Sequence, residues 1–226
     1  MPVVFHEYAE ARSHLIACLG EYCSYCGMQL DAALAVEHVK PKIRESATRE
    51  LSWANFLLAC VNCNSTKGDE ETTLPDYLWP DQDNPMAALC YGPGALVEPA
   101  EGLSAPERTR AENTIRLTGL DHMPSRTQCK TASDRRWLHR QLAWDLANKQ
   151  KAKLARHRDA PSAVLDDLRD DTLELALARG YWPVWYTVFQ DDADMRHRLL
   201  AAFPGTHTAS FDPADGRALV RFPAGG

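Results

Sequence analysis

The stretch Leu57–Asp69, "LLACVNCNSTKGD", decides how the N-terminal part of the chain is interpreted. Two cysteines, Cys60 and Cys63, are separated by two residues, and Asn64 and Lys67 follow them at once. Such a pair is typical of a redox dithiol, of half a metal site, or of buried thiols with no further role. The partners that the rest of the chain supplies decide among these three.

Composition indicates the compartment. The chain has 226 residues and a formal net charge of −6. It contains no run of about eighteen apolar residues, so no membrane span is expected. The N-terminal residues lack the basic stretch and apolar core of a secretory signal. We therefore expect a cytoplasmic protein, in which seven cysteines favour metal or redox use over a disulfide framework.

A second pair of cysteines answers the opening question. Cys23 and Cys26 have the same spacing, and 33 residues separate them from the pair at Cys60 and Cys63. Four thiolates in two tight turns match tetrahedral Zn²⁺. A thioredoxin-like interpretation is poor, because neither pair lies between a strand and a long helix. The sequence predicts a structural zinc site, and the alternative is that one pair consists of buried thiols.

The segment between the two pairs carries residues suited to catalysis. Glu37 and His38 are adjacent in "VEHVKPK", and Asn55 and Asn64 flank the second cysteine pair. Histidine is the natural general base near neutral pH, and a carboxylate with an amide oxygen suits Mg²⁺. Each residue alone is common at a protein surface. Their order along the chain is much harder to obtain by chance.

At these residues the sequence resembles the HNH (His-Me finger) endonuclease family, over about Glu21–Glu70. The resemblance implies a β-hairpin followed by a helix, clasped by zinc. It implies that His38 and Asn55 are the catalytic residues, His38 as general base and Asn55 as the residue that holds the hairpin loop. Glu37 and Asn64 would ligate a catalytic Mg²⁺ or Mn²⁺, although many members have Asp or His at the first position and His at the second. By the same resemblance, the candidate contacts to the substrate phosphate are Lys40, Lys42 and Lys67.

A looser resemblance extends beyond this module. The stretches "KPK", "NTIRLTGLD" and "FPGTHTASFD" are similar to bacterial HNH nucleases of the PtuB type, found in Septu and retron-associated defence systems. This resemblance implies a role in antiviral defence together with a partner ATPase. The region after the nuclease module would then provide the docking surface.

The patterning of the whole chain predicts an α+β fold, with a zinc-stapled ββα-metal module followed by a mainly helical region. We place the boundary near Thr73, which gives a nuclease module at 1–73 and a substrate- or partner-binding region at 74–226. Short strands are expected around 32–42, before Cys60, at 86–92, at 95–102 and at 218–222. Helices are expected at 6–22, at 105–118 behind a capping box of Ser104 and Glu107, at 133–158 and at 161–180.

Charge is unevenly spread. Residues 108–158 contain thirteen Lys and Arg against four Asp and Glu, whereas residues 159–226 contain six against eleven. The basic helix at 133–158 could follow a phosphate backbone, or it could have an ordinary solvated face. In this helix Leu138, Leu142 and Leu146 recur every four residues. The candidate phosphate contacts are Arg135, Arg136, Arg140, Lys149, Lys151 and Lys153.

The leading hypothesis is a metal-dependent nuclease, with DNA preferred to RNA or tRNA. A non-catalytic zinc-stapled module that binds nucleic acid or serves as an adaptor is the alternative. It would explain the cysteines but leave Glu37, His38 and Asn64 as coincidence. A third hypothesis is a nuclease subunit that is silent until a partner binds, and the net negative charge favours it.

Overall fold

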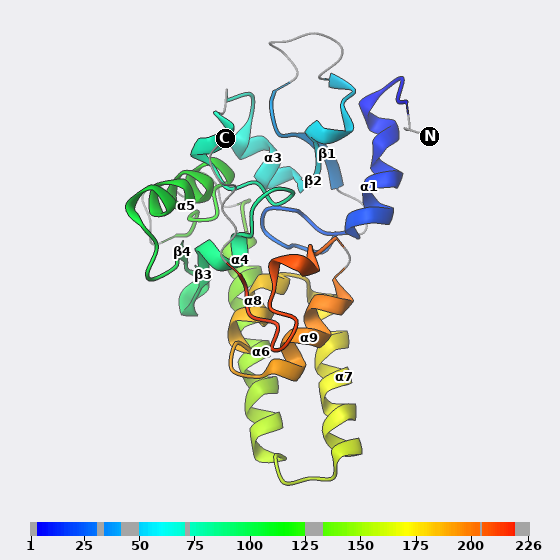
Figure 1. The fold of residues 1–226 in the computed structure, drawn as a ribbon, viewed down its shortest axis with the longest axis vertical. Helices are drawn as coiled ribbons and strands as arrows, with labels where there is room; N and C mark the ends of the chain where they lie inside the picture. Colours follow the sequence, from blue (N-terminus) through cyan, green and yellow to red (C-terminus); the bar gives the residue numbers. More distant parts are fainter. Residues whose placement is uncertain are drawn as a thin grey trace.

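The computed structural model describes residues 4–30, 34–41, 50–70, 73–124, 133–203 and 205–219. It combines helices with two small antiparallel sheets of two strands each. Figure 1 shows the first sheet at one end of the molecule and a long helical hairpin at the other. The predicted α+β fold, with a module near the N-terminus followed by helices, is confirmed.

The N-terminal part forms the predicted hairpin and helix. Strands β1 and β2 pair antiparallel, with Glu37 opposite Leu57 and His38 opposite Phe56. Alternate residues of the hairpin pack on different sides, so that Leu58 faces α1 while Leu57 faces the cysteines. The elements are η1 (Tyr8–Glu10), α1 (Ala11–Leu19), β1 (Leu34–His38), η3 (Trp53–Asn55), β2 (Phe56–Cys60) and α3 (Val61–Lys67).

The middle of the chain wraps this module and ends in α5. The predicted capping box is present: the Ser104 backbone N–H donates to the Glu107 carboxylate over 2.7 Å, and the helix ends at Thr118 as expected. The elements are η4 (Leu74–Asp76), α4 (Pro85–Ala88), β3 (Leu89–Tyr91), η5 (Pro93–Ala95), β4 (Val97–Pro99) and α5 (Ala105–Thr118).

The last part of the described chain is helical. Helices α6 and α7 lie side by side and extend away from the β1–β2 hairpin (Figure 1). The strand predicted at 218–222 lies largely outside the described residues. Within its described part, Ala218 forms an isolated bridge with Phe211. The elements are α6 (Arg136–Arg156), α7 (Ser162–Arg179), α8 (Trp182–Val188), α9 (Ala193–Ala202) and η6 (Thr208–Ser210).

One hydrophobic cluster surrounds the four cysteines and takes residues from both sides of Thr73. Leu57 packs in it together with Leu78, Ile115, Ala143 and Val184. The two-domain division stays a prediction. The described residues show a continuous core across the expected boundary.

The buried face of α6 differs from the leucine stripe that its sequence indicates. Leu142 is 42% exposed. The residues that α6 buries are Arg136, Arg140, Ala143, Ala147, Gln150 and Leu154. Alanines at two successive turns of that face let α8 pack closely against α6, and the arginines satisfy backbone carbonyl oxygens.

The first cysteine turn contacts the junction of α7 and α8. The Tyr181 N–H donates to the Gly27 carbonyl oxygen over 2.6 Å. Gly180 has φ of 68° and lies so close to Gln29 that a Cβ at this position would collide with the backbone of Gln29. Residues more than 150 positions apart in the sequence therefore meet beside the cysteines.

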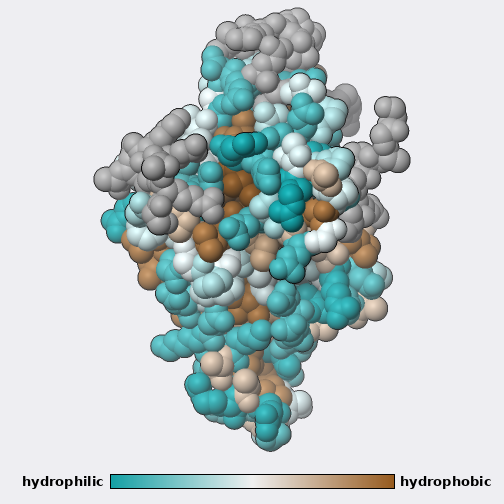
Figure 2. All heavy atoms as spheres, turned by 90° about the vertical axis from the view of Figure 1, so that its left-hand side faces the viewer, coloured by the Kyte–Doolittle hydropathy of each residue, from teal (hydrophilic) through white to brown (hydrophobic). Residues whose placement is uncertain are grey.

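The outer surface is largely polar. Figure 2 shows a mostly hydrophilic face, on which hydrophobic residues are exposed in small separate areas. Scattered apolar residues of this kind are normal for a folded domain. Within the part of the chain that the structure describes, no helix has the length and apolarity needed to cross a membrane.

Candidate functional site

The four predicted zinc ligands converge. The sulfur atoms of Cys23, Cys26, Cys60 and Cys63 all lie within 4.8 Å of one another, and the Cys26 and Cys60 sulfurs are 3.8 Å apart. Zn–S bonds of about 2.3 Å in a tetrahedron place sulfurs about 3.8 Å apart. All four side chains are buried and none forms a disulfide. The cluster therefore fits a structural zinc ion.

Local structure explains why the cysteines meet. Cys60 is the last residue of β2 and caps α3, with its sulfur accepting from the Cys63 N–H over 3.4 Å. The N–H of Ser24 donates to the Leu58 carbonyl oxygen over 2.8 Å and holds the first turn beside β2. Hydrogen bonds from Cys23, then from Cys26 and Cys63, lower the pKa of the Cys60 thiol. Hydrogen bonds with Cys23 and Cys60 raise the pKa of Cys26, and burial raises the pKa of Cys63, so a metal that binds here has to displace the protons of these two thiols.

A cavity of about 180 Å³ lies at the end of β1 and collects three of the predicted site residues. Glu37 and His38 come from the strand, and Asn64 comes from the first turns of α3. Asp69, just after α3, also lines it. Residues that carry a carboxylate, an imidazole and an amide therefore line one small volume, and these groups are of the kind that binds a hard divalent cation.

Surrounding groups set the orientation of His38. Its ring packs edge-on against Tyr8 and Phe56, with centroid distances of 5.3 and 5.2 Å. Its Nε2 lies 3.0 Å from the Glu50 carbonyl oxygen. A carbonyl oxygen can only accept, so Nε2 carries the hydrogen in this contact. The basic nitrogen of the neutral ring is then Nδ1.

Lys67 forms a buried ion pair with Glu37. Its ammonium lies 2.9 Å from Glu37 Oε1 and donates to the His38 carbonyl oxygen over 2.8 Å. Burial raises the pKa of Glu37, and the Lys67 charge opposes that shift. The predicted phosphate contact by Lys67 is therefore wrong in this structure, because its side chain is 1% exposed and already paired.

Residues 23–70 match the HNH endonuclease family model. The match implies metal-dependent nuclease activity and includes the four cysteines together with Glu37, His38 and Asn64. No curated protein and no solved structure matches the chain. We refer to residues 23–70 below as the HNH segment.

Asn55 joins the two ends of the hairpin in the HNH segment. Its side-chain oxygen accepts from the Lys40 N–H over 2.8 Å, and its Nδ2 donates to the Lys40 carbonyl oxygen over 3.0 Å. The Val39 N–H donates to the Asn55 carbonyl oxygen over 3.0 Å. These bonds fix the backbone next to His38. The expected part of Asn55 in catalysis is therefore one of positioning, and it stays a prediction.

The other basic residues predicted to contact phosphate differ in their exposure to solvent. Lys40 lies next to the cavity and is partly exposed, and its contact with substrate stays a prediction. Lys42 lies outside the described residues. Arg136 and Arg140 are wrong as phosphate contacts, since both are buried. Lys151 donates to the Val188 carbonyl oxygen over 2.8 Å, so its ammonium is already engaged within the protein.

Asp69 is a site residue that the sequence analysis missed. It follows Gly68, which ends α3, and its carboxylate is exposed on the wall of the cavity. The motif itself contained the signal, in the "KGD" after the second cysteine pair. Because α3 ends at Lys67, Gly68 and Asp69 lie beside the end of β1. The spacing of the cysteines and asparagines in the sequence does not predict this turn.

We expect Lys67→Met to lower the free energy of unfolding by about 3–5 kcal/mol, because it leaves the Glu37 carboxylate buried without a counter-ion. Urea unfolding of the zinc-loaded protein at pH 7 measures the change. The double variant Glu37→Gln/Lys67→Met removes both charges and should lose much less. Lys153→Met, which breaks an exposed pair with Asp171 at 3.7 Å, should cost at most about 1 kcal/mol. Equal effects of Lys67→Met and Lys153→Met would contradict the argument.

Proposed function

We propose that this protein is a metal-dependent endonuclease that hydrolyses phosphodiester bonds in nucleic acid, with DNA as the preferred substrate. One observation carries the proposal. The cavity of the HNH segment brings Glu37, His38 and Asn64 together beside a buried four-cysteine cluster. An imidazole next to oxygen donors is the arrangement that activation of water beside a metal requires.

His38 would act as the general base. Because Nε2 is directed at the Glu50 carbonyl oxygen, Nδ1 would take the proton from the attacking water. The bond from Lys67 to the His38 carbonyl oxygen and the bonds of Asn55 to Lys40 hold this part of the strand in place. The ring therefore needs little reorganisation to act on a water molecule beside the substrate phosphate.

Glu37 and Asn64 would hold the catalytic Mg²⁺ or Mn²⁺, and Asp69 offers a third oxygen ligand from the same cavity. The ion would stabilise the negative charge that develops on the leaving oxygen. Burial raises the pKa of Glu37, the positive charge of Lys67 opposes that shift, and the same charge opposes a cation nearby. We therefore expect the charge of Lys67 to weaken metal binding at this site.

We further propose that the protein works with a partner ATPase in antiviral defence. The resemblance to PtuB-type nucleases supports this role, as does the net charge of −6, which weakens unaided binding to DNA at physiological salt. The non-catalytic binding module is less well supported than the nuclease, because it relies in part on the basic helix as a surface for nucleic acid. Two of the arginines that were candidates for tracking a phosphate backbone are buried inside the protein.

The test is a cleavage panel with the zinc-loaded protein. Supercoiled plasmid, linear duplex, single-stranded DNA and total tRNA are each incubated with Mg²⁺, with Mn²⁺ or with EDTA, beside the His38→Ala variant. We expect metal-dependent cutting of DNA that the variant lacks. Cutting of tRNA alone would correct the substrate class. If zinc-loaded protein cuts nothing, either alone or with an ATPase captured with it in a pull-down, the nuclease proposal fails.

A further inference from the structure

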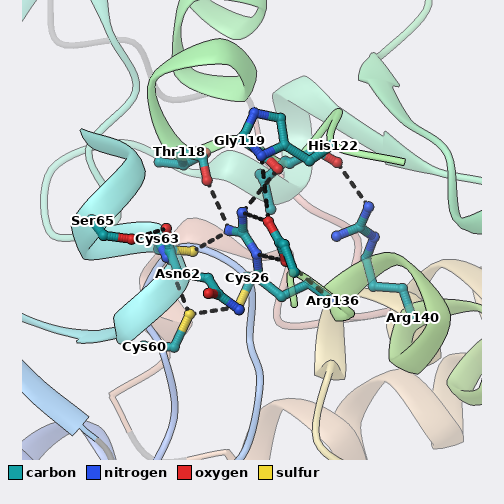
Figure 3. Close-up of polar contacts among 12 residues, drawn as sticks. Cys26, Cys60, Asn62, Cys63, Ser65, Thr118, Gly119, His122, Arg136 and Arg140 are labelled. Atoms are coloured by element: carbon teal, nitrogen blue, oxygen red, sulfur yellow. Dashed lines mark hydrogen bonds and ion pairs between the residues drawn. The ribbon is translucent and has the colours of Figure 1, made fainter. Parts of the chain in front are cut away.

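A buried arginine from α6 contacts the cysteine cluster. Nη1 of Arg136 donates to Cys63 Sγ over 2.9 Å, across 73 positions of sequence. Figure 3 shows the guanidinium lying between Cys63, Thr118 and Gly119, with dashed lines from it to all three residues. The same Nη1 donates to the Thr118 carbonyl oxygen over 2.8 Å, and Nη2 donates to that of Gly119 over 3.1 Å. Arg136 is 2% exposed.

Asp134 orients this guanidinium. Its carboxylate accepts from Arg136 Nε over 2.9 Å and from Nη2 over 2.7 Å, which leaves Nη1 turned toward the sulfur. His122 Nδ1 lies 3.3 Å from the same carboxylate. A planar guanidinium held by a carboxylate on one edge presents its other donors in fixed directions. The contact with Cys63 is therefore built by the surrounding fold.

A second arginine lies one turn further along α6. Arg140 is 1% exposed and donates to the carbonyl oxygens of Ala95 and Leu120 over 3.1 and 2.8 Å. Among the described residues no carboxylate pairs with it; burial lowers the pKa of Arg140, and the charges of Tyr91 and Cys26 oppose that shift. An unpaired buried charge is costly, so the counter-charge of Arg140 has to come from another group.

Zinc bound by four thiolates supplies that counter-charge, because the complex carries a net charge of about −2. Arg136 brings a positive charge into hydrogen-bonding contact with one of the four ligands, and Asp134, which holds Arg136, brings one negative charge. We propose that Arg136 is a positioning residue of the zinc site: it donates a charge-assisted hydrogen bond to the zinc ligand Cys63. The inference rests on the zinc site and is independent of whether the protein cleaves nucleic acid.

The proposal gives the helical region a function in metal retention. Hydrogen bonds to metal ligands fix their direction and tune the ligand charge. Because Arg136 begins α6 while Cys63 belongs to α3, the bond also joins the helical hairpin to the HNH segment. Zinc bound to the HNH segment is thus stabilised by residues far outside it.

We expect Arg136→Met to lower zinc affinity about 10- to 100-fold in competition with a chromophoric chelator. In the cobalt-substituted protein, the thiolate-to-cobalt charge-transfer band should move to lower energy, because a sulfur without its hydrogen bond holds its electrons less tightly. Arg136→Lys, which keeps the charge but has no planar fork, should lie between Arg136→Met and the wild type. This variant also carries the comparison if Arg136→Met does not fold.

Arg110→Met is the matched control. Arg110 also pairs with a buried carboxylate, Asp83, at 2.9 Å and donates to the Tyr77 carbonyl oxygen over 2.7 Å. Its loss should lower the melting temperature but leave zinc affinity and the cobalt band unchanged. Wild-type affinity and an unshifted band in both Arg136 variants would overturn the proposal. So would equal shifts in Arg136→Met and Arg110→Met, since these would reflect general destabilisation. Neither readout involves cleavage, so failure here is distinct from failure of the nuclease proposal.

Discussion

Serine in place of Cys60 is expected to leave the protein without a stable native state. A serine hydroxyl stays protonated at neutral pH and is a poor zinc ligand, so the site loses its metal. Binding of structural zinc is worth about 10–16 kcal/mol, whereas the net stability of a folded domain is about 5–15 kcal/mol. Cys60 also joins β2 to α3, so the loss acts where the hairpin meets the helix.

Zinc content, far-UV circular dichroism and thermal melting measure the effect. The Cys60→Ser variant should bind no stoichiometric zinc and show no cooperative melting transition. Cys18→Ser is the control, because Cys18 is exposed and lies outside the cluster. It should match the wild type in all three measurements. A Cys60→Ser protein that melts like Cys18→Ser would show that the four cysteines are not a structural metal site.

His38→Ala is expected to lower the rate of metal-dependent cleavage by about 10²–10⁴-fold, the usual contribution of a general base. The loss should appear in kcat more than in KM, since the imidazole acts on the attacking water rather than on binding of the nucleic acid. Initial rates on a plasmid or a labelled oligonucleotide, with saturating Mg²⁺ and confirmed zinc content, measure it. The melting temperature of the variant separates this effect from the loss of packing against Tyr8 and Phe56.

His14→Ala is the matched control, because His14 is an exposed residue of α1 whose ring contacts Phe5 at 5.7 Å. It should retain full activity. His38→Gln tests the role of the basic nitrogen more closely, since an amide keeps hydrogen-bonding capacity but has no basic lone pair. Cleavage by His38→Gln at the wild-type rate would rule out His38 as the base.

Much of the nuclease-like module could be predicted from the sequence. Two pairs of cysteines at the same spacing are typical of a zinc site. If they bind one zinc ion, Cys23, Cys26, Cys60 and Cys63 must lie together, as they do in the structure. The strand at Leu34–His38 and the helix that begins at Ala105 also follow from local patterns, a run ended by Pro41 and a capping box. Local signals of this kind need no knowledge of distant neighbours.

The charged residues show where such reasoning stops. Lys67, Arg136 and Arg140 look like phosphate contacts in the sequence, because a basic side chain on a helix is usually solvated. In the structure each is buried and contacts a group far away in the sequence: Glu37 for Lys67, the Ala95 carbonyl for Arg140 and, besides its neighbour Asp134, Cys63 for Arg136. Only the tertiary fold determines whether a charge faces water or a buried counter-ion.

The contact of Tyr181 with Gly27 has a consequence for synthesis on the ribosome. The chain grows from its N-terminus, so all four cysteines emerge while Arg136 and Tyr181 are still untranslated. At about 5–20 residues per second, this interval lasts on the order of ten seconds. A nascent chain can capture zinc during that time, but its cysteine cluster is covered only when nearly the whole protein has been made. Fragments released from the ribosome before that point therefore expose the cysteine cluster that the complete fold buries.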